Sequence, residues 1–240
     1  MSLDMLSNVQ STKQNEIEFS TFCSNLAGLD IEYDWRAINS HGARNLRGKP
    51  NDVFEDLCNL NQSGYNIFVT INKTDGKDVK GINVNEVRAL FADFDNTPLS
   101  NLDRIHLKPS FIVNTSPEKY HAYWLIDECP LKQFTPIQQK LARILESDPA
   151  VCDLGRIMRV PGFYHLKSDP FLVTISAENE ITNYSYEDFS SSLPSSYTVN
   201  DGNTDYSLNI GCEEGSRNTT LTKLARYRSY FKVKKMECAQ

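Results

Sequence analysis

The sequence lacks several features that would place its 240 residues in a specialised class of protein. No apolar run approaches the roughly 18 residues that a membrane-spanning helix needs, so we expect no membrane association. The N-terminus has no basic start followed by an apolar stretch, which argues against a secretory signal. No internal repeat is present. Because hydrophobic residues make up 40% and charged residues 23%, most of the chain is predicted to fold around a core.

Paired cysteines are also missing. The six cysteines form no CxxC pair, and no Cys/His cluster has the spacing of a zinc finger. We therefore expect six reduced, mostly buried thiols in a cytoplasmic protein. They are Cys23, Cys58, Cys129, Cys152, Cys212 and Cys238.

An excess of positive charge is absent, because the formal net charge is −6. This value argues against a protein that coats nucleic acid by bulk attraction. It does not exclude a polymerising enzyme, whose site needs clustered carboxylates as well as local basic strips. The basic residues here are clustered locally, in 156–167 and again in 217–228.

Composition along the chain predicts four segments. We expect a disordered N-terminus, one catalytic domain, a Ser/Asn/Asp-rich linker, and the start of a helical C-terminal unit that contains a basic helix. The chain is accordingly interpreted as the N-terminal portion of a longer protein. The four segments are residues 1–14, 15–189, 190–205 and 206–240, with the basic helix over 216–231.

Hydrophobic periodicity predicts both helices and strands within the catalytic domain. Helices are expected over 15–28, over 52–64 with Asn51 as the cap, and over 131–147. Strands are expected over 31–38, 65–72, 87–95, 110–116, 119–127, 156–163 and 171–178. The segment 39–51 is expected to be a loop because of its Gly, Pro and Asn content, and 110–127 is expected to form a hairpin.

The first chemical signal is a pair of acids at the end of the apolar run 87–95. Asp93 and Asp95 lie at i and i+2, so on a strand they point to the same face. Two such carboxylates repel each other unless a cation lies between them, and Mg²⁺ or Mn²⁺ suits carboxylate oxygens. A DxD pattern alone is a weak motif. The alternative to a metal site is therefore a purely structural strand end that runs into a turn at Asn96.

The same residues allow a second interpretation. The run ADFDNTPL also matches the DxDx[TV] signature of haloacid-dehalogenase-type phosphatases, in which the first acid, here Asp93, attacks phosphate. That signature normally lies near the start of a chain. Here it follows about 90 residues of structured sequence, and no GDxxxD-like acidic cluster lies downstream.

The expected strand over 119–127 carries a second signal. Lys119, His121 and Tyr123 alternate along one face of this strand. A lone histidine on a strand is more often structural than functional. However, a cation and an imidazole on one face can bind a triphosphate, and the histidine can also donate a proton.

The third signal is the run DLGRIMRVPGFYHLK, which begins at Asp153. It combines a third carboxylate with Arg156, Arg159, His165 and Lys167. A core strand rarely tolerates this density of cations without a polyanionic partner. The alternative is a surface strand whose basic side chains extend along apolar surface to reach water.

The order of these motifs resembles the archaeo-eukaryotic primase superfamily, and above all its RepB-like plasmid and phage primases and primase-polymerases. The resemblance spans about residues 30 to 178 and rests on the DxD pair, the histidine strand and R-x-x-R-x-P-G-F-x-x-x-K. Asp93 and Asp95 match the first family motif, His121 the second and Asp153 the third. The second motif is often Ser-x-His, whereas Lys119 stands at the first of these positions here, which leaves the role of Lys119 open.

This resemblance implies an α+β fold, with an RRM-like antiparallel sheet, flanking helices and an additional α/β portion that together form one catalytic cleft. It implies a template-dependent nucleotidyltransferase that makes primers on single-stranded DNA from nucleoside triphosphates. Two divalent ions, Mg²⁺ or Mn²⁺, would be held by Asp93, Asp95 and Asp153. The triphosphate would be bound by His121, Arg159 and Lys167, with Lys119, Arg156 and Ser116 as weaker candidates.

Such cores are usually followed by a helicase domain, so a helicase is an expected partner beyond residue 240. Two other functions remain open from the residues alone. One is the phosphatase, and the other is a catalytically silent nucleic-acid-binding module with an RRM-like sheet.

Overall fold

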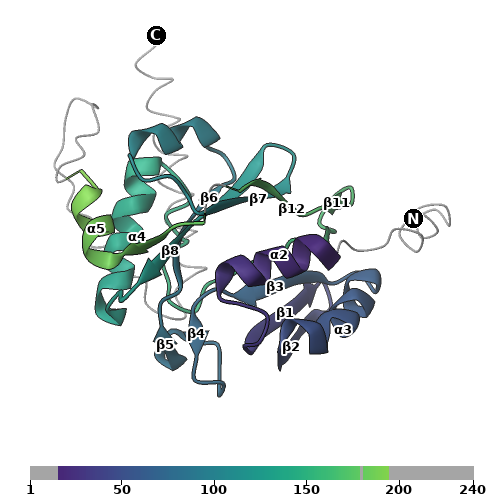
Figure 1. Cartoon of the computed structure of the whole chain (residues 1–240). Helices are drawn as coiled ribbons and strands as arrows, with labels where there is room; N and C mark the ends of the chain where they lie inside the picture. Colours follow the sequence, from purple (N-terminus) through teal and green to yellow (C-terminus); the bar gives the residue numbers. More distant parts are fainter. Residues whose placement is uncertain (1–15, 179–180, 195–240) are drawn as a thin grey trace, which may run out of the picture. The chain divides into compact units, whose positions relative to one another are not determined.

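The computed structural model describes residues 16–178 and 181–194. The described chain is a mixed α+β fold, as predicted, in which two largely antiparallel sheets lie on either side of an amphipathic helix (Figure 1). No helix within these two ranges combines the length and apolar character that crossing a membrane requires. The predicted disordered N-terminus and basic C-terminal helix lie outside the described residues.

The first sheet has the strand order β2-β1-β3-β9. It comprises β1 (Tyr33–Asn39), β2 (Gly42–Gly48), β3 (Asn66–Thr70) and β9 (Ile157–Arg159). The prediction of a loop over 39–51 is wrong, because β2 pairs with β1 along its whole length. β2 is an exposed edge strand without an apolar face, so no alternation of burial marks it in the sequence.

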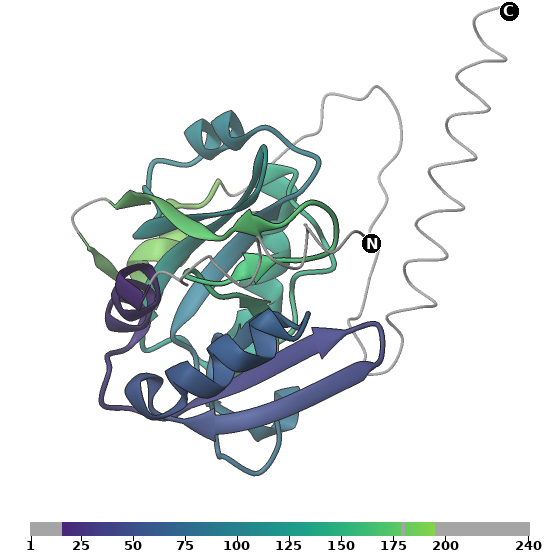
Figure 2. The same cartoon turned by 90° about the vertical axis from the view of Figure 1, so that its right-hand side faces the viewer.

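Two helices cover the buried face of this sheet. α2 (Glu16–Leu26) lies between the sheets, because Phe19 contacts Trp35 on β1 while Phe22 contacts Phe111 and Tyr123 of the second sheet. α3 (Pro50–Gln62) packs along β1, β2 and β3, and Figure 2 shows it running over the sheet. The expected Asn51 cap is wrong, because Lys49 is the N-cap residue and Pro50 begins the helix.

The second sheet contains the predicted hairpin. It comprises β6 (Ala89–Phe94), β7 (Phe111–Ser116), β8 (Lys119–Asp127), β12 (Thr174–Glu178) and β13 (Asn183–Ser185). β8 is central, with antiparallel β7 and β6 as neighbours and a short parallel pairing to β13. All residues of β6 except Asp93 are buried, which confirms the prediction of a buried strand. The functional role of the acids at its end stays a prediction.

Helix α4 (Leu131–Leu145) braces the outer side of β6. The buried Gln138 side chain accepts a hydrogen bond from the Phe91 amide and donates to the carbonyl oxygens of Phe91 and Val151. It thereby satisfies part of the open edge of β6 and fixes the loop that follows α4 against this strand. Next to α4 (Figure 1), Phe189 of α5 (Tyr186–Ser192) packs edge-on against Trp124, and Lys140 of α4 donates to the Leu193 carbonyl oxygen just beyond α5.

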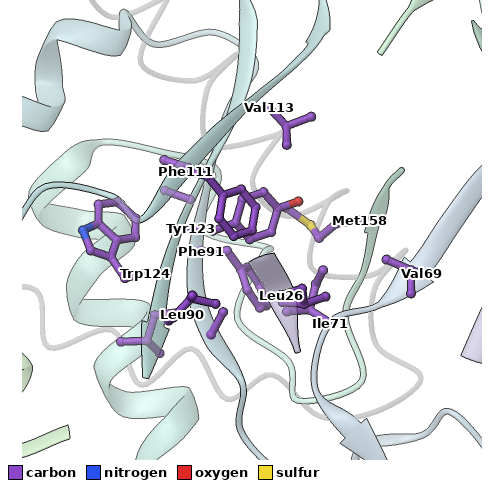
Figure 3. Close-up of a cluster of buried hydrophobic side chains, with 14 of the residues drawn as sticks. Leu26, Val69, Ile71, Leu90, Phe91, Phe111, Val113, Tyr123, Trp124 and Met158 are labelled. Carbon is purple, nitrogen blue, oxygen red and sulfur yellow. The ribbon is translucent and has the colours of Figure 1, made fainter. Parts of the chain in front are cut away.

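The main core fills the space between the two sheets. Figure 3 shows Phe91, Phe111 and Tyr123 of the second sheet facing Val69, Ile71 and Met158, which come from the strands of the first. The rings of Phe111 and Tyr123 are stacked with centroids 4.7 Å apart. Because apolar side chains from both sheets share this core, each sheet is held in place relative to the other.

A single buried side chain ties three segments together. Asn72, just beyond β3, donates from Nδ2 to the Leu154 carbonyl oxygen (3.0 Å) and accepts at Oδ1 from the Arg88 amide (3.1 Å). Arg88 immediately precedes β6, and Leu154 lies in the basic run that the sequence singled out. The loop after α4 is thus fastened to both sheets.

The remaining elements are short. They are β4 (Lys73–Thr74), the 3₁₀ turn Gly81–Asn83, β5 (Val84–Glu86), the 3₁₀ turn Leu99–Arg104, β10 (Tyr164–His165) and β11 (Phe171–Leu172). The strand expected over 156–163 is shorter than predicted, since only Ile157–Arg159 pairs. The strand expected over 171–178 is divided into β11 and β12 around Val173. The expected linker over 190–205 begins inside α5, which continues to Ser192.

The expectation of reduced cysteines is confirmed for three residues. Cys23, Cys58 and Cys129 carry free thiols, and burial raises the pKa of Cys58 and Cys129 to about 11. The expectation is wrong for Cys152, which is fully buried and carries no free thiol. The other two cysteines, Cys212 and Cys238, lie outside the described residues.

Candidate active site

The pairing of β6 with β8 builds the centre of the site. Asp93 lies directly opposite His121 in this register, so both side chains project from the same face of the sheet. His121 Nε2 is 3.7 Å from Asp93 Oδ1, and His121 Nδ1 is 3.3 Å from the Tyr123 hydroxyl. The two expected motifs are therefore brought together by the antiparallel register.

His121 is neutral in this setting. Burial lowers its pKa to about 3, and the nearby charges of Arg159 and Arg156 act in the same direction. Burial raises the pKa of Tyr123 well above its usual range, so its hydroxyl keeps the proton and can donate to Nδ1. In that arrangement the proton of neutral His121 resides on Nε2, which faces Asp93, and the contact is not an ion pair.

Asp93 is a carboxylate in a place that disfavours its charge. Its side chain is only 17% exposed, and Oδ1 is buried without a hydrogen-bond partner. Burial raises the pKa of Asp93 to about 7, together with the charges of Asp95 and Asp148, while Arg156 and Lys119 oppose the shift. A buried carboxylate that repels its neighbours and lacks a donor is suited to binding a cation.

Asp95 lies one residue beyond the end of β6 and is more open, with 47% of its side chain exposed. Its Oδ1 atom is 3.6 Å from Lys119 Nζ, an ion pair near the surface. The two acids of the DxD pair differ in environment, since Asp93 is the buried partner and Asp95 the accessible one.

Asp148 is a site candidate that the sequence reasoning missed. Its backbone amide donates a 3.0 Å hydrogen bond to the Asp93 carbonyl oxygen, and its negative charge is among those that raise the Asp93 pKa. One carboxylate oxygen also accepts from the Ala150 amide (2.9 Å). Its local sequence, an Asp-Pro pair after a helix, carries no signal that would separate it from an ordinary helix-terminating turn.

Asp153 has a different set of contacts. Its carboxylate is 2.9 Å from Arg156 Nη2, and the same guanidinium donates to the Ala150 carbonyl oxygen. Among the charges that dominate the Asp93 pKa are Asp95, Asp148 and Arg156, and Asp153 is not one of them. Asp153 therefore orients Arg156 and closes the turn that carries Asp148.

Arg159 is held at the edge of the site by β9. Its Nη1 atom donates to Asn66 Oδ1 (3.0 Å), and its guanidinium lies 4.9 Å from the centre of the Phe68 ring. Burial lowers the pKa of Arg159 to about 10, against the pull of Asp95 and Asp93, and it remains a cation at neutral pH. A half-buried cation beside two acids is positioned to bind the phosphates of a metal-bound nucleotide.

His165 on β10 is a further candidate without an assigned role in the sequence. Its Nδ1 atom donates to the Thr115 carbonyl oxygen (3.0 Å), whereas the buried Nε2 atom has no partner. Burial lowers its pKa, as do the charges of Arg159, Lys167 and Lys119. Lys167 is exposed near this imidazole.

Ser116 completes the sequence candidates. It is buried at the end of β7 and pairs with Lys119 in the hairpin register. Its placement gives it a role in the hairpin turn, and none of the contacts seen among the described residues joins it to Asp93 or Asp95.

The donor chemistry of the site fits a hard divalent ion. Asp93 and Asp95 supply carboxylate oxygens, and the buried Oδ1 of Asp93 has no protein donor. Within residues 16–178 and 181–194, no three His, Cys, Asp or Glu side chains are gathered closely enough to form a complete metal cluster. The expected convergence of Asp93, Asp95 and Asp153 is therefore not seen in this part of the chain, and nucleotide oxygens or water would have to complete the coordination.

Comparisons with known proteins agree with this geometry. Residues 82–192 match the family model of the RepB DNA-primase N-terminal domain. This range contains the DxD pair, the histidine strand and the basic run. No curated protein sequence matches the chain.

Solved structures share the fold. The AEP domain of the cyanophage S-2L primase-polymerase matches with a TM-score of 0.65 and 18% identity, covering 76% of this chain and 100% of that one. Primase RepB′ matches with a TM-score of 0.52 and 17% identity, covering 70% and 58%. The catalytic domain of RepB′ in complex with initiator DNA matches with a TM-score of 0.50 and 18% identity, covering 70% and 87%. The family match selects a primase over the phosphatase and the silent binding module. Residues 82–192 of this chain are thus similar to the N-terminal domain of RepB DNA primases, a family of nucleotidyltransferases of DNA replication.

Proposed function

We propose that this chain makes primers on single-stranded DNA by metal-dependent nucleotidyl transfer, in replication of the plasmid or phage type. The observation that carries the proposal is the Asp93–Asp95 pair, whose charges are flanked by Lys119, Arg156 and Arg159. Acids for metal ions beside cations for phosphates are what phosphoryl transfer requires, since its catalysis depends on positioning and charge neutralisation.

Asp93 and Asp95 would hold the metal ions, with Asp148 as the third carboxylate. Two divalent ions, Mg²⁺ or Mn²⁺, would supply the positive charge that nucleotidyl transfer needs at the attacking hydroxyl and at the leaving pyrophosphate. Asp153, which the sequence motif nominated for this set, acts instead by holding Arg156 beside the site. Asp148 is preferred because it is bonded to the Asp93 backbone and its charge reaches the Asp93 carboxylate.

The triphosphate would be bound on the other side of the acids. Arg159 is fixed by Asn66, and the Nε2–H of neutral His121 is an additional donor. Lys119, Arg156 and Lys167 provide the remaining positive charge around this position. His165, whose Nδ1 is committed to Thr115, would offer Nε2 as an acceptor to a hydroxyl or water of the bound nucleotide.

Single-stranded DNA is the proposed template. A RepB′ catalytic domain of the same fold was crystallised with initiator DNA, and by this likeness the chain described here would also bind DNA. The whole reaction would then join a nucleoside triphosphate to a primer hydroxyl, or to the hydroxyl of a first nucleotide, as directed by the template.

The test is incorporation of labelled nucleotides on single-stranded DNA with Mg²⁺ or Mn²⁺. The wild-type chain is compared with the Asp93→Asn/Asp95→Asn variant, which keeps the side-chain size but removes both charges. Template-dependent products that disappear in the variant support the proposal, and parallel reactions with dNTPs and NTPs identify the preferred sugar. Products that persist in the variant would contradict the assignment of these acids.

A further inference from the structure

The first sheet has a face that its two helices leave uncovered, and this face begins at the candidate active site. The segment after β3 covers only its far corner, where Thr74 bonds to Asp34 and Arg47. The side chains of Tyr33, Trp35 and Ala37 on β1 are buried against the helices, so the alternate residues project from the opposite face. On that face, the register aligns one row across all four strands. From edge to site, the row is Asn45, Arg36, Phe68 and Arg159.

This row reaches the acids through Arg159. Neighbouring strands are about 4.8 Å apart, so Arg36 lies about 10 Å from Arg159 along the row at the backbone level. Phe68 stands between the two arginines, half-buried and with the Arg159 guanidinium 4.9 Å from its ring centre. A strip of cation, aromatic ring and cation therefore leads away from Asp93 and Asp95 across the open sheet.

Arg36 has no acidic side chain paired with its guanidinium within the residues that the structure describes. Its Nε atom is buried without a hydrogen bond. The nearby Asp78 is itself paired with Lys80 at 2.9 Å. By contrast, Arg47, which lies on the same face, forms ion pairs with Asp34 and Glu32. An unpaired guanidinium on an open sheet face calls for an anionic ligand.

We propose that the row Asn45–Arg36–Phe68–Arg159 binds the single-stranded DNA template and directs it toward the acids. A half-buried ring with cations on either side matches the requirements of an unpaired strand, whose bases stack on aromatic faces and whose phosphates attract arginine. Duplex DNA is disfavoured, because its bases are already stacked on each other. The inference rests on the proposed primase function for its choice of ligand, but it concerns residues outside the metal site.

The test is a binding titration of a dye-labelled mixed-sequence DNA oligonucleotide, followed by fluorescence anisotropy in EDTA without nucleotides. Phe68→Ala should weaken binding by about five-fold or more, because stacking contributes about 1–3 kcal/mol per base. Phe68→Trp should restore it. Arg36→Gln should lower the slope of log K against log salt by about 0.7, the value expected for one lost phosphate contact on a single strand.

Arg44→Gln is the matched control. Arg44 lies on the same sheet opposite Ala37, hence on the other face, with its guanidinium 5.4 Å from the Tyr65 ring centre. The Arg44→Gln substitution removes one positive charge, as Arg36→Gln does. It should leave the DNA affinity and the salt dependence of binding unchanged. Thermal unfolding of each variant shows whether it is folded. If Phe68→Ala does not fold, the test rests on Arg36→Gln, because Arg36 is only half-buried and its substitution should leave the fold intact.

Two results would overturn the proposal. One is wild-type affinity in both Phe68→Ala and Arg36→Gln, and the other is an equal loss in Arg44→Gln. The assay also separates this inference from the proposed function. If primers are made while both row variants bind DNA normally, the proposed template row is wrong and the primase function is unaffected. If binding depends on Phe68 but no primers are made, the proposed function is wrong and the row remains a DNA-binding surface.

Discussion

The amide of Asp148 donates a 3.0 Å hydrogen bond to the carbonyl oxygen of Asp93, so the loop after α4 lies directly against the strand that carries the DxD pair. We expect Asp148→Asn to reduce nucleotide incorporation by about 100-fold or more, because it removes a metal-binding charge. Asp153→Asn, which loosens only Arg156, should cost about 10-fold, in the range of residues that orient ligands. Steady-state incorporation with Mn²⁺ measures both.

The comparison is matched, because asparagine at position 148 can still accept the hydrogen bond from the Ala150 amide. The loop should therefore keep its shape. A larger loss in Asp153→Asn than in Asp148→Asn would reassign the third carboxylate to the position that the sequence motif nominated.

Asp93 should make the stability of the metal-free protein depend on pH. Its pKa is raised from 3.8 to about 7 by burial and by the charges of Asp95 and Asp148. Between these two values the folded chain keeps a proton that the unfolded chain has lost, so the free energy of unfolding falls as pH rises. The penalty is complete above about pH 7 and is relieved as pH falls toward 4.

The measurement is urea unfolding in EDTA, with wild type compared to Asp93→Asn. The variant should gain stability relative to wild type as the pH is raised from about 5 to about 8. Adding Mn²⁺ at the higher pH should reduce this difference, since the ion compensates the charge. Parallel pH curves for the two proteins would show that Asp93 titrates normally.

Tyr123 is predicted to orient His121. Tyr123→Phe keeps the stacked contact with Phe111 but removes the hydroxyl that is 3.3 Å from His121 Nδ1. We expect the KM for nucleotide to rise a few-fold, because the Nε2–H is no longer fixed, and the melting temperature to change little. The effect should vanish in a His121→Asn background, since the hydroxyl acts through the imidazole. Additive losses would indicate that Tyr123 acts by another route.

Gly155 is predicted to be required by a close backbone approach. A Cβ atom at this position would lie 2.3 Å from the Val79 carbonyl oxygen, so Gly155→Ala must displace the loop or the Asp153–Arg156 turn. We expect a loss of about 1–3 kcal/mol in stability, together with reduced incorporation. Thermal unfolding and the incorporation assay provide the two measurements.

Gly81→Ala is the control for this substitution. Gly81 belongs to the same close approach, because its amide nitrogen is among the atoms that a Cβ at Gly155 would meet. A Cβ added at Gly81, however, would be 3.7 Å from Leu154 Cβ, an ordinary van der Waals distance. It should leave stability and activity nearly unchanged. Equal effects of the two substitutions would mean that the loop yields easily and does not position the turn.

Much of the second sheet could be predicted from sequence. β6 is an unbroken apolar run, and β7 and β8 are separated by a two-residue turn, so local pattern alone identifies them. The apolar run and the hairpin depend on short-range signals, which a single sequence contains. The antiparallel register of β6 and β8, which places Asp93 opposite His121, is seen only in the structure.

The edge strand β2 could not be predicted in the same way. It is polar and contains two glycines, so its strand conformation comes from backbone pairing with β1 and not from the burial of one face. The row from Arg36 to Arg159 exists only because β1, β3 and β9 lie side by side, although β9 is about ninety residues away from β3 in the chain.

The sequence by itself determined which chemistry is present: a DxD pair, a histidine strand and a basic run, in the order of the primase family. The tertiary structure decided which of the acids approach one another. Asp153 is the acid that matches the third family motif, but in the structure it is paired with Arg156. Asp148 is the acid whose amide is hydrogen-bonded to the Asp93 backbone. That choice depends on how Gln138 and Asn72 fasten the loop after α4 to the sheets, and such long-range hydrogen bonds leave no local pattern in a sequence.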